Sequence, residues 1–179
     1  MQTSSPPDVW RVIAAEAAQE SRLWSEALLP EHRRAHLAVF SPLAREAAAL
    51  GIETIYEGYL LHYGRPRLFG PLSEDVTLLL GDYLYAHGLV RIASLEQVEA
   101  VADLAALISL CGQLRADGRP GEGPAWAATA ALLGTGRLEA PREALRVSGD
   151  ARPLFEAAAS AAGPAAVRRA LEVHAGRVG

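Results

Sequence analysis

Only a few residues in this sequence have a type and spacing suited to chemistry. Asp82 is the one formally charged residue between Val76 and Val90, and a carboxylate in apolar surroundings needs a hydrogen bond, an ion pair or a metal. This placement predicts a ligand contact or, more commonly, a structural hydrogen bond to a neighbouring helix. His32 and His36 have the spacing of two metal ligands on one helix face. The residues between them include two arginines and no glutamate, which favours a solvated face over a zinc site.

The remaining polar candidates are isolated along the chain. His62 and His87 lie in apolar contexts and are predicted to be core histidines, and Cys111 is predicted to be a small core residue. Arg65 and Arg67 flank Pro66 in a predicted loop. Arginines in such a loop are suited to phosphate or carboxylate recognition, with solvated loop charges as the alternative.

Composition excludes several classes of function. The chain has 179 residues, half of them hydrophobic, and a formal net charge of −4, which predicts one domain and disfavours nucleic acid as a partner. All 17 cationic residues are arginine, so Schiff-base and P-loop lysine chemistry is excluded. A single cysteine excludes an internal disulfide. We find no signal peptide and no membrane-spanning stretch, and we expect a cytoplasmic protein that is not an integral membrane protein, with residues 1–7 flexible.

The elements that must position these residues are helical. The 35 alanines and the abundant leucines favour an all-α fold, and strand patterns are nearly absent. Between proline and glycine breaks we predict helices over residues 8–28, 30–50 with a bend at Ser41–Pro42, 52–63, 76–90, 94–115, 124–133, 141–147, 153–162 and 164–175. The helix over 76–90 is apolar all round, which predicts a buried central helix.

Six short segments between Ala44 and Ala162 follow one another in an order typical of one enzyme family. They are Ala47–His62, Gly64-Arg65-Pro66, Leu79-Leu80-Gly81-Asp82-Tyr83-Leu84-Tyr85-Ala86, Gly112-Gln113-Leu114, Ala128-Thr129-Ala130-Ala131-Leu132 and Phe155-Glu156. In this order they resemble segments of the trans-isoprenyl diphosphate synthases, the polyprenyl synthetases. The resemblance implies that residues 1–179 form a single-domain helical bundle with a shortened isoprenoid-synthase-like fold.

The departures from that family concern its metal sites. The enzymes bind magnesium through two D-D-x-x-D motifs, but here the chain passes from His62 and Tyr63 directly to Gly64, and alanines follow Phe155-Glu156. Ala128 stands where the family has a lysine. The resemblance therefore implies a chain with no catalytic residues, no metal site and no cofactor of its own, in which magnesium belongs to a catalytic partner.

A helical scaffold without its metal ligands resembles the small, non-catalytic subunits of heteromeric bacterial polyprenyl diphosphate synthases. The resemblance implies a partner subunit with intact aspartate-rich motifs, whose prenyl-chain tunnel this chain would shape, or self-association, through apolar surface around Ile52–Leu61 and Val76–Val90. The residues implied for the tunnel wall or the interface are Gly58, Tyr59 and Tyr83. The residues implied as polar remnants of a substrate site are Arg65, Arg67, Asp82, Gln113 and Thr129.

Two other functions stay open from the sequence. A stand-alone degenerate synthase fold would bind a hydrophobic or isoprenoid ligand in its former tunnel. An enzyme with different ligands could use Asp82, Glu57 and Glu74, although no two of these have metal-ligand spacing within a helix.

Overall fold

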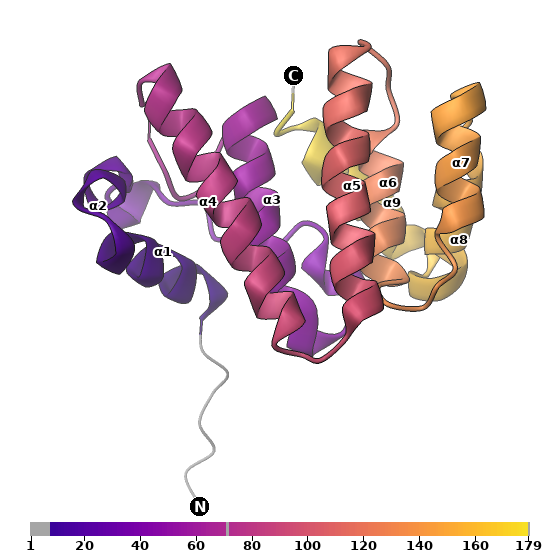
Figure 1. Cartoon of the computed structure of the whole chain (residues 1–179), viewed down its shortest axis with the longest axis horizontal. Coiled ribbons are helices and arrows are strands. Elements are labelled where there is room, and N and C mark those ends of the chain that lie inside the picture. The colour runs from indigo at the N-terminus through magenta and orange to yellow at the C-terminus, as the bar shows by residue number, and fades with distance from the viewer. Residues whose placement is uncertain (1–7, 71, 179) are drawn as a thin grey trace, which may run out of the picture.

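The computed structural model describes residues 8–70 and 72–178, and the prediction of a flexible segment over 1–7 lies outside them. The described residues form an all-α domain (Figure 1) in which no strand occurs apart from one isolated bridge between Leu28 and Phe69. The predicted all-α class is therefore confirmed. The helices are α1 (Val9–Glu20), α2 (Arg22–Ala27), α3 (Ala49–Tyr63), α4 (Glu74–Ala93), α5 (Val98–Ala116), α6 (Glu122–Ala131), α7 (Glu139–Ser148), α8 (Arg152–Ala162) and α9 (Pro164–Ala175).

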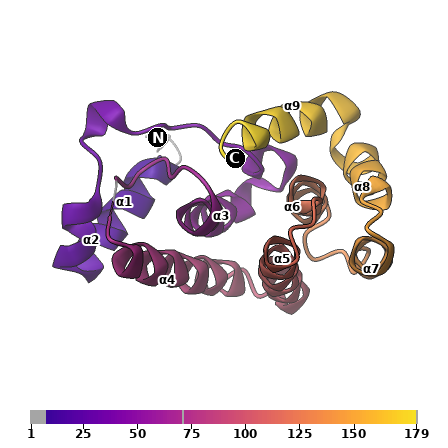
Figure 2. The same ribbon diagram turned by 90° about the horizontal axis from the view of Figure 1, so that it is seen from above.

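Helix α3, and not α4, is the central helix. Figure 2 shows α4 and α5 along one side of the molecule, α3 and α6 behind them, and α9 on the opposite side. Every residue from Gly51 to Leu61 of α3 is buried, whereas Leu79 and Val90 of α4 are 59% and 65% exposed. The prediction of a buried helix over 76–90 is therefore wrong: one side of α4 packs on α3 and its other side faces solvent.

Glycines allow α3 and α4 to approach closely in an antiparallel arrangement. Gly51 of α3 faces Gly88 of α4, and Gly58 of α3 faces Gly81 of α4. Within each helix the two glycines are seven residues apart, which is about two helical turns. A Cβ atom on Gly58 would lie 2.8 Å from the Gly81 carbonyl oxygen, and one on Gly88 would lie 2.4 Å from Cγ1 of Ile55. The helix backbones therefore pack directly against each other at these positions.

The predicted helix over 30–50 does not form. Its place is taken by extended backbone and three short 3-10 turns, Glu31–Arg33, Ser41–Leu43 and Glu46–Ala48. The backbone amides of Val39 and Ser41 donate to Glu53 Oε1, both at 3.2 Å, and Ala35 donates to the Arg67 carbonyl. These contacts with residues distant in sequence replace the hydrogen bonds that a helix would supply.

Two other predicted boundaries differ. The first helix is interrupted at Ser21, whose hydroxyl caps α2 by accepting from Leu23 N–H. The helix predicted to begin at Ser94 begins at Val98, because Ser94 ends α4 by donating its N–H to the Val90 carbonyl.

Candidate functional site

Arg67, predicted as a substrate-site remnant, is fully buried against α3. Its Nε donates to Glu57 Oε2 at 2.8 Å, and its Nη1 donates to Glu53 Oε2 and, at 2.9 Å, to the Leu37 carbonyl. The guanidinium carbon also lies 4.6 Å from the centre of the Trp10 ring. Arg67 is therefore a structural residue in this chain and is not exposed to a solvent-borne anion.

Every carboxylate oxygen of the two glutamates that bind Arg67 already accepts at least one hydrogen bond. Glu57 Oε1 accepts from the N–H groups of Arg67 and Leu68 at 2.7 and 2.8 Å, and Glu53 Oε1 accepts from two amides of the 34–43 segment. The cluster therefore fastens two loops to α3. Sequence analysis did not identify Glu53 as a candidate. The available signal was its position four residues before Glu57 in an otherwise apolar helix.

The structure does not bring together the three acids of the enzyme alternative. Glu57 is buried in the arginine cluster, whereas Glu74 and Asp82 are exposed on α4. Among residues 8–70 and 72–178, no three His, Cys, Asp or Glu side chains are grouped so that they could hold a metal ion.

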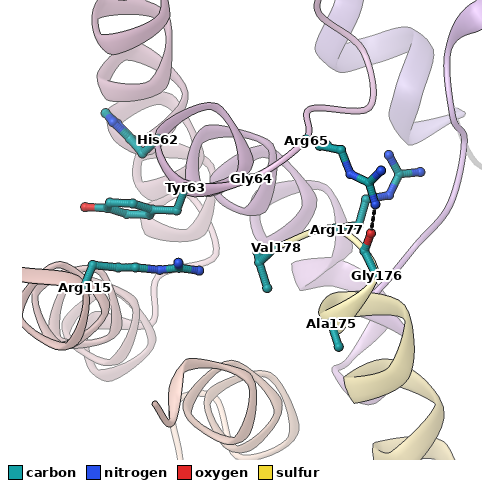
Figure 3. A pocket seen from close by; sticks show the side chains of 9 residues that line it. All are labelled: His62, Tyr63, Gly64, Arg65, Arg115, Ala175, Gly176, Arg177 and Val178. Atoms are coloured by element: carbon teal, nitrogen blue, oxygen red, sulfur yellow. Dashed lines mark hydrogen bonds between the residues drawn. The ribbon is translucent and has the colours of Figure 1, made fainter. Parts of the chain in front are cut away.

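Arg65 lies in a cleft of about 700 Å³ at the end of α3, where α5 and the C-terminal turn meet it (Figure 3). Its N–H donates to the Arg177 carbonyl at 2.9 Å, and its guanidinium donates to the Gly176 carbonyl. Arg115, on the α5 side, donates to Glu122 Oε1 at 2.6 Å. The C-terminal ends of α3, α5 and α9 meet at this cleft. The positive charges of Arg65 and Arg115 offset the partial negative charge of these helix ends. Arg65 therefore holds the C-terminal turn in place.

Asp82 is not the buried carboxylate that the sequence predicted, because its side chain is 73% exposed. Its Oδ1 lies 3.2 Å from Nε2 of the mostly buried His62, but the two groups are not oriented as a hydrogen bond. Burial lowers the pKa of His62, and the nearby Asp82 carboxylate opposes that shift. His87 is half-buried rather than a core residue, and its Nε2 lies 2.6 Å from Glu16 Oε2.

The residues predicted for a tunnel wall lie on different sides of the bundle. Gly58 contacts α4, Tyr59 is enclosed in the core with its hydroxyl 3.2 Å from Arg115, and Tyr83 packs on Trp24 of α2 with ring centres 4.1 Å apart. The Ile52–Leu61 surface predicted to contact a partner is covered by the chain itself.

The last two predicted remnants differ in exposure and lie on different helices. Thr129 is buried in α6, where its hydroxyl accepts from Arg142 at 3.3 Å beside the Arg142–Asp103 ion pair. Gln113 is exposed on α5. The structure therefore does not assemble the predicted polar residues into one substrate site.

Aromatic side chains fill the interior between α3, α6 and α9. Phe40, Tyr56, Tyr59, Trp126 and His174 have ring centres 5.1–5.9 Å apart in the pairs that contact each other. Tyr56 Oη lies 2.9 Å from His174 Nδ1. Burial lowers the pKa of His174 to about 4, so the imidazole is neutral near pH 7 and its Nδ1 can accept a hydrogen bond from the Tyr56 hydroxyl.

The most unusual surface is the solvent-exposed side of α4 and α5, which we call the outer face. It consists of Leu78, Leu79, Asp82, Ala86, Val90 and Ala93 of α4 and Val98, Ala102, Ala105, Ser109 and Gln113 of α5. Leu78, Leu79, Val90 and Val98 are 47–78% exposed. An apolar groove of about 570 Å³ lies where the two helices join, between Ala93 and Ala105. Because large exposed apolar patches are typical of interaction surfaces, the outer face is the candidate surface for a partner.

In the described part of the chain, no helix combines the length and the apolar character that crossing a membrane requires. Comparisons with protein-family models, with curated proteins and with solved structures find no match to this chain.

Proposed function

We propose that this chain is a non-catalytic subunit of a heteromeric trans-polyprenyl diphosphate synthase, and that its outer face binds a catalytic subunit with intact aspartate-rich motifs. The motif order between Ala44 and Ala162 supports the choice of family. The observation that carries the proposal is the exposure of large apolar side chains on the outer face. That face lies on the helix containing Gly81-Asp82-Tyr83-Leu84, the segment with the most distinctive resemblance.

Binding through this face has a physical driving force. Leu79, Val90 and Val98 each expose more than half of their surface, and burying such a side chain contributes about 1 kcal/mol or more. Helix α4 has 20 residues and is therefore about 30 Å long, which matches the dimensions of a standard protein interface. Docking on the outer face would place α4 and α5 beside the partner without disturbing the core around α3.

The environment of the acidic residues supports a non-catalytic role. Glu53 and Glu57 are buried and paired with Arg67 and backbone amides, so neither is presented to a magnesium–diphosphate complex. The alternative function, binding of a hydrophobic ligand inside the bundle, has less support, because aromatic rings around Trp126 fill the space beside α3. Magnesium would therefore be bound by the catalytic partner.

The test is co-expression with a synthase of the same genome that carries both D-D-x-x-D motifs. We expect the two chains to co-purify, and the product chain length to differ from that of the synthase alone. Leu79→Glu and Val90→Glu on the outer face should abolish both effects. Val147→Glu is the matched control, because Val147 is 73% exposed on α7 and is not one of the outer-face residues. Unchanged products and no co-purification would refute the proposal.

A further inference from the structure

On α4, α5 and their junction, the exposed formal charges all have one sign. Every residue from Glu74 to Ala116 is described, and this stretch contains five exposed acids, Glu74, Asp75, Asp82, Glu96 and Glu99, and no exposed arginine. Asp82 lies within the apolar strip of α4, and Glu96 lines the groove at the α4–α5 junction. The apolar surface is therefore bordered mainly by acids, although the exposed Arg45, which precedes α3, donates to Gln97 at the groove.

The two arginines of the same stretch are held away from the face by acids of other elements. Arg91 is bound by Glu16 of α1, and its side chain is only 14% exposed. Arg115 donates to Glu122 of α6. Neither guanidinium is therefore free to neutralise an acid of the outer face or an acid of a molecule docked on it.

We infer that the outer face selects a partner whose apolar docking surface is bordered by lysine or arginine, and that it excludes a second copy of this chain. The inference rests on the proposed function for its location. A two-fold dimer through this face would place Asp82 and Glu99 of one copy near the acids of the other. Like charges at a desolvating interface oppose association, whereas a basic border would pair with them and accelerate binding.

The groove adds a steric preference to the electrostatic one. Val98, Val101 and Ala102 line it, with Glu96 at its edge. An apolar side chain of the partner fits between the valines, and a neighbouring arginine or lysine can reach Glu96. This arrangement gives the partner one anchor and one charge pair at the vertex where α4 and α5 meet (Figure 1).

The lone chain tests the exclusion of a second copy. We expect sedimentation equilibrium in 50 mM NaCl to show a monomer. The variant Asp82→Asn/Glu99→Gln should self-associate at least 10-fold more tightly, and 500 mM NaCl should move the wild type toward the variant, because salt screens exposed charges. A tight wild-type dimer at low salt that Val90→Glu dissociates would overturn the inference. Equal association of wild type and variant would overturn it as well.

The complex with the co-expressed synthase tests the basic border. We expect Asp82→Arg/Glu99→Arg to weaken binding at least 10-fold and to reduce its salt dependence. Glu172→Arg, an exposed reversal on α9 at the opposite side of the molecule, should leave binding unchanged. A complex that is insensitive to both salt and charge reversal would overturn this inference and leave the proposed function standing. The absence of any complex would overturn both.

Discussion

Replacing Gly88 with alanine should destabilise the protein, although alanine is the better helix former. A Cβ atom at this position would lie 2.4 Å from Ile55 Cγ1, 3.0 Å from the Gly51 carbonyl oxygen and 3.1 Å from Ile55 N. Two of these three contacts are with the backbone of α3, so a side-chain rotation cannot relieve them. Helix α4 must therefore move away from α3.

The expected magnitude is the difference between two opposing effects. Overpacking of a close interface costs up to about 3 kcal/mol, and the helix propensity of alanine returns about 1 kcal/mol. Gly88→Ala should therefore lower the free energy of unfolding by about 2 kcal/mol, which corresponds to a Tm lower by roughly 4–8 °C for a domain of this size.

Gly112→Ala supplies the matched control on α5. A Cβ atom there would have Tyr63 Oη as its nearest neighbour, at 3.7 Å, which is an ordinary van der Waals contact. Only the propensity gain remains, so this variant should be more stable by up to about 1 kcal/mol. Urea denaturation followed by circular dichroism at 222 nm measures both. If Gly88→Ala were as stable as Gly112→Ala, the close approach of α3 and α4 would be refuted.

Three other outcomes are expected. Arg67→Met leaves Glu53 and Glu57 buried without their cation and should lower the free energy of unfolding by about 3–5 kcal/mol, measured by urea denaturation. The pKa of His174 is lowered to about 4 in the folded state, so the unfolded chain binds more protons between pH 4 and 6.5. The free energy of unfolding should therefore fall, by at most about 3 kcal/mol, as the pH is lowered through this window. His174→Gln should flatten this dependence of the free energy of unfolding on pH. Burial raises the pKa of Cys111, so its labelling by a thiol reagent should be slow in the native protein and should accelerate only in urea concentrations that unfold it.

Local signals in the sequence were enough for most helices and for some capping residues. Ser73 was expected to begin a helix, and its hydroxyl accepts from Val76 N–H at the start of α4. Pro153 and Pro164 lie in the first turns of α8 and α9. The burial of Cys111 was also predicted. These features depend on a few neighbouring residues, so a single sequence contains the information.

The candidate site was predicted less well, because each error concerned a partner distant in sequence. Arg67 was expected to be either an anion-binding or a solvated residue of a loop. In the structure it forms a buried ion pair with Glu57, which lies ten residues earlier on α3. Asp82 was expected to be buried because its neighbours are apolar. The same neighbours, Leu79 and Val90, prove to be the exposed surface on which the proposed function depends.

The sequence alone determined the helical class, the approximate positions of most helices, the absence of lysine chemistry and the seven-residue glycine spacing. Tertiary structure decided which of the two apolar helices, α3 or α4, became central. Helix α3 is covered on one side by α4 and on the others by α1, by the 34–43 segment and by the Trp126 ring of α6, whereas α4 is covered on one side only. Burial depends on how many elements pack around a helix, and hydrophobic composition by itself does not specify that number.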